Sequence, residues 1–528
     1  MELLILLAVT ALLILYAAYE LMPIGAGRNS THWRTSLLQT LNVHRTLMVI
    51  GVCSELVYLF GFVTQYSLPR WLSNSYLDLG AMTNHSQSGF ILFAGALGIV
   101  FLLLSLAWNR VWDRTDSGTL LVVLGFGALF GLTMAFLYPI TALDVFAYFD
   151  ESLILTQYHQ NPLFVAPSAF PHDPLMGLSA SFNGAVAPYG PLALVADAIP
   201  TFLVGRHVLA SLLLLKLMFA GLLVVEAYLV YRILRRISPR HAVAGALVVA
   251  WNPLLLYEAI GNGHNDIVMM LFVLLAVLSL VEGRLALAVV LLVASVLVKY
   301  VTGLLIPLFV LYGLTHCASR RERIRFAVLS AIASVALVVA AYAPFWGGIT
   351  TITTVLSQGD RYADSLSSTL GSLFPTGPTP HQSALLGRIL FVPVYLYAAW
   401  LSTRRSLDLL QGCFLVMFFF LVLVATNTEP WYATWPIVLA ALVPGLVERL
   451  SAVLLGCGAM FGNTLYIFIW IWLGLGDPNN FRIINVSVYA ITFMPATLVL
   501  FGYMLCRRTL WWHKMELRMG VSRSEEVI

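Results

Sequence analysis

The chain consists of long apolar segments separated by short polar ones. Apolar runs of about 20 residues, the length that crosses a hydrocarbon core of about 30 Å, recur from end to end. In lipid, such a run satisfies its backbone hydrogen bonds internally by forming an α-helix. The pattern predicts an all-α polytopic membrane protein, with candidate spans at residues 2–22, 46–65, 88–107, 118–139, 207–231, 242–259, 266–282, 285–315, 326–344, 388–402, 407–425, 434–447, 451–473 and 485–505.

The apolar run at 285–315 does not fit a single crossing. It begins after Arg284 and ends before the arginine cluster at 320–325, so it must cross an even number of times if both ends face the cytoplasm. Two helices of about 15 residues would each be only about 22 Å long, which is tolerated where helices line a protein cavity. Lys299 would then lie at their outer junction. The expected total is about 14–15 transmembrane helices.

Positive charge is distributed unevenly between the two sides of this topology. Cytoplasmic loops are rich in Lys and Arg, and the strongest clusters lie at 232–241, 319–325, 403–405 and from Arg507 onward. When these clusters are placed inside, all but seven of the 29 Lys and Arg residues fall on the cytoplasmic side. The long loop at 140–206 is therefore expected to face away from the cytoplasm.

Composition supports the membrane assignment and excludes several other classes. Of 528 residues, 60% are hydrophobic and 10% are charged, with a mean hydropathy of +0.88, whereas soluble domains carry roughly 25% charged residues. The net charge of +4 is spread along the chain, so no nucleic-acid partner is expected. The five cysteines form no CxxC motif and predict neither a disulfide framework nor a zinc site.

The first polar stretch that could carry chemistry is "LDVFAYFDESL" at 143–153. Asp144 has apolar neighbours, and partial desolvation raises the basicity of a carboxylate, which suits a general base. A solvated helix end is the alternative for Asp144 and the preferred interpretation of Asp150 and Glu151. On a helix, Asp150 would point about 120° away from Asp144, so the two can hardly serve one hydroxyl group.

The second stretch is "NGAVAPYGPLALVADAIP" at 183–200. Pro188 and Pro191 favour extended backbone on either side of Tyr189. The apolar segment that follows is too short to span and carries Asp197, so we expect a helix that lies along the outer interface. A plain loop turn is the alternative for the proline-rich part.

The third stretch is "GNGHND" at 261–266, a hairpin between two spans. Ionisable residues at membrane depth are candidates for function, and His264 is expected to contact the substrate. Asn265 or Asp266 could instead be the N-cap of the next helix.

The fourth stretch is "ATNTEPWYATWP" at 425–436. Glu429, Trp431 and Tyr432 stand at an outer boundary, where Trp and Tyr commonly form interfacial belts. The alternative is a stacking wall for a sugar or a lipid-phosphate headgroup.

Taken in order, the motifs resemble a known family. They are "D-V-x-x-Y", "NPL", "PYGPL", "WNPLLL…GxGHND", "VKY" and "PWYxxW", and they look like those of the polyprenol-phosphate-mannose-dependent alpha-mannosyltransferases of the GT-C glycosyltransferase superfamily. The resemblance implies a GT-C-like catalytic core at 118–448 with a membrane-associated helical outer loop at 140–206. Transmembrane helices at 1–117 would precede this core, and helices with a basic cytoplasmic tail at 449–528 would follow it.

The resemblance also implies a set of site residues. The family's general base falls on Asp144, although Asp150 and Glu151 add two acids where a more neutral helix is expected. Lys299, His264, Arg361 and Arg388 are candidates for stabilising a leaving phosphate. The full set of expected substrate-binding residues is Tyr148, Asn161, Tyr189, His264, Asn265, Asp266, Lys299, Arg361, Glu429, Trp431 and Tyr432.

The expected function is that of a multi-pass cell-membrane glycosyltransferase with an extracytoplasmic active site. It would move a sugar, with mannose the first choice, from a polyprenyl-phosphate donor to a hydroxyl of a lipid or glycan acceptor, with inversion. No cofactor is expected; the outer carboxylates would allow a divalent metal but do not demand one. A ligase or polymerase of lipid-linked glycans stays open as an alternative, as does a transporter or flippase of lipid-linked sugars, although a transporter would more naturally show inverted repeats.

Overall fold

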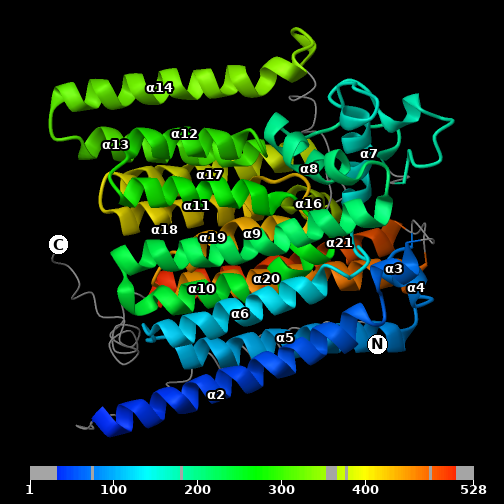
Figure 1. Cartoon of the computed structure of the whole chain (residues 1–528), viewed down its shortest axis with the longest axis horizontal. Helices are drawn as coiled ribbons and strands as arrows, with labels where there is room; N and C mark the ends of the chain where they lie inside the picture. Colours follow the sequence, from blue (N-terminus) through cyan, green and yellow to red (C-terminus); the bar gives the residue numbers. More distant parts are fainter. Residues whose placement is uncertain are drawn as a thin grey trace.

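The computed structural model describes residues 33–72, 77–178, 182–351, 365–374, 379–474 and 478–506. Within these ranges the chain is helical, and strand-like pairing is limited to an isolated bridge between Ser67 and Leu137. Most helices lie side by side with their long axes roughly aligned (Figure 1). The predicted all-α class is therefore confirmed.

Nine helical segments of the described chain are long and apolar enough to cross a membrane, or ten if the bent pair α10–η5 is one span. The long helices are α2 (Trp33–Val57, continued by η1 at Tyr58–Val63), α5 (Gln87–Val111), α6 (Ser117–Met134), α9 (Val208–Ile237), α14 (Arg320–Tyr342), α17 (Pro380–Ser402), α18 (Ser406–Phe419, continued by η9 at Phe420–Val424), α20 (Leu446–Leu473) and α21 (Pro478–Cys506). The bent pair is α10 (Ala242–Ala250) and η5 (Leu255–Gly261).

The count of long spans is lower than the predicted 14–15 because several predicted spans are short helices. These are α11 (Asp266–Val281), α12 (Leu285–Val296), η6 (Tyr300–Leu305) with α13 (Ile306–His316), and η10 (Pro430–Ala433) with α19 (Thr434–Ala441). The first predicted span, 2–22, lies outside the described residues. The short helices are packed among the longer ones (Figure 1), which is where short spans are tolerated.

The segment at 285–315 forms two helices, as its flanking charges predict. Helix α12 ends at Val296, and η6 begins at Tyr300. Lys299 lies in the intervening break with extended backbone (φ −139°, ψ 130°). The sequence thus places a lysine at the junction of two short helices.

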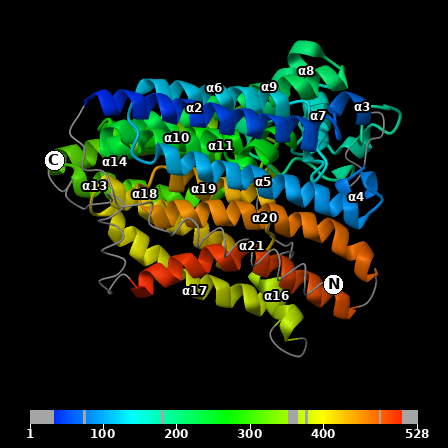
Figure 2. The same ribbon diagram turned by 90° about the horizontal axis from the view of Figure 1, so that it is seen from below.

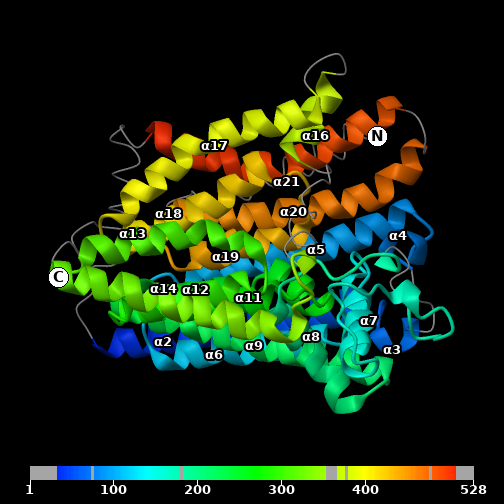
Figure 3. The same ribbon diagram turned by 90° about the horizontal axis from the view of Figure 1, so that it is seen from above.

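One end of the bundle carries a cap of short helices. It consists of α3 (Leu68–Trp71), α4 (Leu79–Met82), α7 (Asp144–Thr156), η2 (Pro167–Ala169) and α8 (Pro191–Val204). Figure 2 and Figure 3 show these helices at the same end of the molecule from two further directions. The turn from α13 to α14 lies at the opposite end (Figure 1). Helix α14 begins with the arginine cluster at 320–325.

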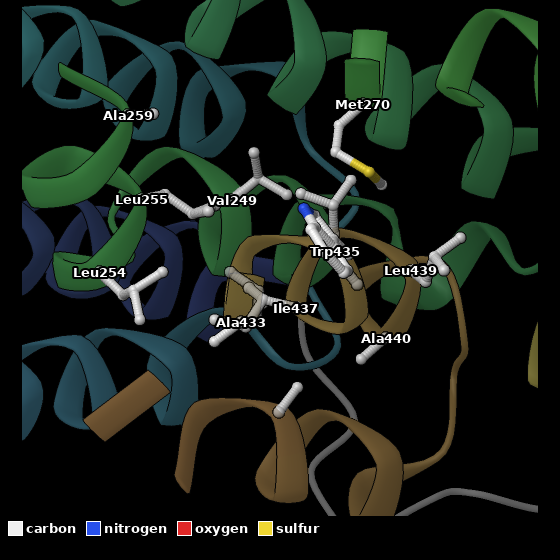
Figure 4. Packing of buried hydrophobic residues seen from close by; sticks show 14 of the residues in the cluster. Val249, Leu254, Leu255, Ala259, Met270, Ala433, Trp435, Ile437, Leu439 and Ala440 are labelled. Carbon is white, nitrogen blue, oxygen red and sulfur yellow. The ribbon is translucent and has the colours of Figure 1, made fainter. Parts of the chain in front are cut away.

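The core of the bundle is formed by α10, α11, α19 and α20. Residues Ala242–Ala250 of α10 are all buried, and 83% of the membrane-length window of α20 is buried. Figure 4 shows Val249, Met270, Trp435 and Ile437 among the buried side chains of this core. This packing holds Trp435 close to the capped end of the bundle.

Candidate active site

A cavity of about 1130 Å³ opens at the capped end of the bundle. Its wall comes from segments far apart in the sequence: the α7 region, the outer loop, the break after α12, and the stretch before α19. Seven of the predicted site residues line it, namely Asp144, Tyr148, Tyr189, Lys299, Glu429, Trp431 and Tyr432. Further lining residues include Asp78, Glu151, Phe182, Tyr300, Asn427 and Trp435.

Helix α7 presents one face to the cavity. Asp144 is its first residue, a position at which a negative charge is stabilised by the helix dipole. Tyr148 and Glu151, four and seven residues later, also line the cavity, since these spacings return to nearly the same face of a helix. The cavity wall is therefore acidic along two turns of α7.

The interpretation of Asp150 and Glu151 as a solvated helix end is wrong. Asp150 is 0% exposed and Glu151 is 7% exposed. The reason is that α8 packs along α7 and covers the face that a free helix end would give to water. The sequence pattern of α7 alone carried no sign of this cover.

The backbone before α7 is held by the N-terminal part of the chain. Leu68 N donates to Phe136 O at 2.7 Å, and Tyr138 N donates to Tyr66 O at 2.8 Å. Leu79 N donates to Ile140 O at 2.8 Å. The loop between α2 and α5 thus fixes the entry to α7, and it also supplies Asp78 to the cavity wall.

The "PYGP" turn joins the outer loop to the break that holds Lys299. Gly190 N donates to Val298 O at 3.1 Å, and a Cβ on Gly190 would lie 2.1 Å from Leu297 O. Only glycine therefore fits this approach. It brings the Tyr189 ring to 4.9 Å from the Lys299 ammonium, a cation–π contact, and the hydroxyls of Tyr189 and Tyr148 to 3.2 Å.

Asp266 lies behind the cavity wall and binds two side chains that line the cavity. Its Oδ2 lies 2.6 Å from Lys299 Nζ, and its Oδ1 accepts a hydrogen bond from Trp435 Nε1 at 2.6 Å. Asp266 itself is fully buried and does not line the cavity. Its geometry is that of a support for the lysine and the tryptophan.

The other residues of "GHND" also lie behind the wall. His264 is 1% exposed and stacks on Trp431 with ring centroids 3.9 Å apart. Asn265 occupies the N-cap position of α11 without a side-chain capping bond, and its Nδ2 donates to Asp197 Oδ2 at 2.8 Å. These residues were expected to contact substrate. In this structure His264 contacts Trp431, which lines the cavity, and Asn265 contacts Asp197, which does not.

The aromatic residues of "PWYATW" face the cavity. Tyr432 and Trp435 are stacked with centroids 4.6 Å apart, and Trp431 lies between the cavity and His264. Stacked rings that line a cavity differ from an interfacial belt, whose rings face lipid headgroups. The arrangement favours the stacking-wall alternative.

Asn161 and the two arginines do not contribute to the described wall. Asn161 Nδ2 donates to Phe345 O at 2.8 Å, which ties the outer loop to η7 (Ala343–Phe345), the short helix that follows α14. Arg388 is exposed on α17, and Arg361 lies outside the described residues. Among the described residues, no group of three His, Cys, Asp or Glu side chains is arranged to hold a metal ion.

Burial and mutual repulsion shift the acidity of the carboxyls between α7 and α8. Burial raises the pKa of Asp197 to about 7, against the hydrogen bond from Asn265 and the charge of Lys299. Burial, with the nearby Asp197, Asp150 and Asp144, raises the pKa of Glu151 well above its usual value. Burial and these neighbouring acids therefore favour the protonated form of Glu151, which lines the cavity.

Comparison with known proteins gives one family and two curated relatives. The family model described as alpha-(1->6)-mannopyranosyltransferase, N-terminal domain, matches residues 48–315, about half of the chain. Alpha-(1->6)-mannopyranosyltransferase A of Mycobacterium tuberculosis is 25% identical over 340 residues, which cover 60% of this chain and 64% of that protein. The protein of the same name from Corynebacterium glutamicum is 26% identical over 185 residues, which cover 35% and 37% respectively. The chain thus matches less than two thirds of the length of either relative.

Proposed function

The chain belongs to the family described as alpha-(1->6)-mannopyranosyltransferase, N-terminal domain, and from this membership we propose that it is an integral membrane mannosyltransferase. The donor is a mannosyl group on a polyprenyl phosphate, and the acceptor is a hydroxyl of a lipid or glycan. The observation that carries the proposal is the meeting of Asp144 and Lys299 in one cavity with the stacking residues Trp431 and Tyr432. A carboxylate, a cation and aromatic rings are what a sugar phosphate and a hydroxyl nucleophile require.

The reaction is a single displacement. Asp144 removes the proton of the acceptor hydroxyl while that oxygen attacks the anomeric carbon. The bond between the anomeric carbon and the phosphate oxygen breaks, and the lipid phosphate leaves with the bonding electrons. Lys299 stabilises the charge of the leaving phosphate, which needs no protonation, so one catalytic carboxylate suffices. The configuration at the anomeric carbon is inverted.

The active site faces away from the cytoplasm in this proposal. The support is the separation of the cavity from the basic clusters: the cap lies at one end of the bundle and the arginine-rich turn before α14 at the other (Figure 1). Basic loops mark the cytoplasmic side. Because sugar nucleotides are cytoplasmic, a lipid-linked donor fits this orientation.

The test is transfer by the purified protein in lipid nanodiscs. Radiolabelled mannosyl-phosphoryl-polyprenol and an α-1,6-linked mannobioside are incubated with the wild type and with Asp144→Asn. The expected product is a labelled trisaccharide with a new α linkage. Asp144→Asn should form it at least a hundredfold more slowly, because a general base typically contributes a rate factor of about 10²–10⁴. Absence of transfer by the wild type refutes the proposal, and movement of the intact donor across a vesicle membrane without transfer identifies a flippase instead.

A further inference from the structure

Glu151 is the one acid of α7 besides Asp144 that lines the described cavity. Seven residues separate the two, which on a helix is about 20° short of two full turns and about 10 Å along the axis. Glu151 is therefore on the same wall as the general base but too far along it to act on the same hydroxyl. It faces a different part of whatever the cavity holds.

The carboxyl group of Glu151 has unused hydrogen-bonding capacity. The side chain is 7% exposed, and its Oε2 has no hydrogen-bond partner among the residues that the structure describes. A buried polar atom without a partner is costly and rare in native proteins. Its position on the cavity wall gives a reason for retaining it: a ligand in the cavity supplies the partner.

The surrounding charges decide which partner suits it. Asp144 and Asp150 on α7, Asp197 on α8 and the Tyr189 phenol face Glu151, while Lys299 is already paired with Asp266. The acids, together with burial, raise the pKa of Glu151 well above its usual value. This setting favours the protonated form of the carboxyl group, and a protonated carboxyl can donate a hydrogen bond to a hydroxyl oxygen.

We infer that Glu151 is a specificity-determining residue that donates a hydrogen bond from its carboxylic acid to a sugar hydroxyl about two helical turns from the reacting centre. The inference rests on the proposed function for the choice of a sugar as ligand. Glu151 therefore has a role in binding, although its sequence context favoured a solvated helix end. The i, i+7 spacing from Asp144 is the signal in the sequence that could have identified it.

The test measures binding of methyl α-1,6-mannobioside and its monodeoxy analogues to the full-length protein in nanodiscs. Tryptophan fluorescence provides the readout, because Trp431 and Trp435 line the cavity. Glu151→Met is expected to raise the dissociation constant about tenfold, and Glu151→Gln, whose amide also donates, to restore most of the affinity. The matched control is Glu226→Met: Glu226 on α9 is 1% exposed and also has an unpartnered carboxyl oxygen, but it does not line the cavity.

The deoxy analogues separate a hydrogen bond from a structural effect. For the one analogue that lacks the contacted hydroxyl, the wild type and Glu151→Met are expected to bind equally. Equal binding of the full sugar by both proteins overturns the inference, as does a constant difference across all analogues. If Glu151→Met does not fold, Glu151→Asp, which withdraws the acid by one methylene, takes its place in the same comparison. The transfer assay is scored separately: a wild type that binds the mannobioside but transfers nothing refutes the proposed function alone.

Discussion

Lys299 and Asp266 form an ion pair in which the lysine lies on the cavity wall and the aspartate is enclosed behind it, with 2.6 Å between Nζ and Oδ2. The second oxygen of Asp266 holds Trp435 by a hydrogen bond from Nε1. One buried carboxylate therefore positions both a cation and an aromatic ring of the cavity. An ammonium has three donors, so Lys299 can keep this pairing and still meet a phosphate.

Removal of the lysine charge should weaken donor binding. Lys299→Met alone leaves Asp266 as a buried, uncompensated charge, which typically costs 3–5 kcal/mol, so the variant is best combined with Asp266→Asn. We expect the double variant to bind mannosyl-phosphoryl-polyprenol at least tenfold more weakly, measured by titration in nanodiscs. Lys299→Arg, which keeps the charge, should retain most of the affinity. Wild-type affinity in the double variant would mean that Lys299 only extends to the interface.

Substitution of the general base should act on turnover and not on donor binding. Asp144→Asn keeps size and removes basicity, so kcat should fall about 10²–10⁴-fold with the donor dissociation constant retained. Asp150→Asn should cost less than about tenfold, because Asp150 is buried and does not line the cavity. Both variants are assayed for transfer under saturating donor. An active Asp144→Asn beside an inactive Asp150→Asn would exchange their roles.

The sequence predicted the parts of this site that depend on local pattern. The apolar runs gave the helical class, the flanking charges of 285–315 gave the break at Lys299, and the proline pair gave the turn at Tyr189. It did not predict which polar groups lie on the wall. Asp266 meets Lys299, and Asn265 meets Asp197, only after α8, α11 and α12 have packed together. These contacts join residues that are 33 and 68 positions apart in the sequence.

The side of the membrane can be tested by cysteine labelling. In the background for this test, Cys53, which is exposed, is replaced by alanine, as is Cys506. A cysteine at Ser168 in the outer loop should then react with an impermeant thiol reagent in intact cells. A cysteine at Thr403, between α17 and α18, should react only after permeabilisation. Both positions are exposed, whereas Ser238 is buried and would be a poor reporter. Reaction of Thr403→Cys alone in intact cells would invert the topology and remove the argument for a lipid-linked donor.

The buried Asp197 should make stability depend on pH. Burial raises its pKa from 3.8 to about 7, so between about pH 4 and pH 7 the unfolded chain has released a proton that the folded protein still holds. The free energy of unfolding therefore falls as pH rises through this range and levels off above about pH 7. At about 1.4 kcal/mol per pKa unit, the loss is about 4 kcal/mol. Asp197→Asn, which cannot titrate, should remove this part of the pH dependence.

Asp173 in the outer loop provides a control of opposite sign. Partial burial works to raise the pKa of Asp173, but hydrogen bonds from Tyr158, the Leu175 backbone and Arg206 outweigh it and lower the pKa. Its stabilising contribution is present above about pH 4 and is lost as the pH falls below that value. Thermal unfolding in detergent is measured from pH 3 to pH 9. The stability of Asp197→Asn relative to the wild type should increase as the pH rises to about 7. The stability of Asp173→Asn should be lower than that of the wild type above about pH 4. If Asp197→Asn instead follows the wild-type curve at every pH, the carboxyl of Asp197 is already charged throughout, and Lys299 together with Asn265 outweighs its burial.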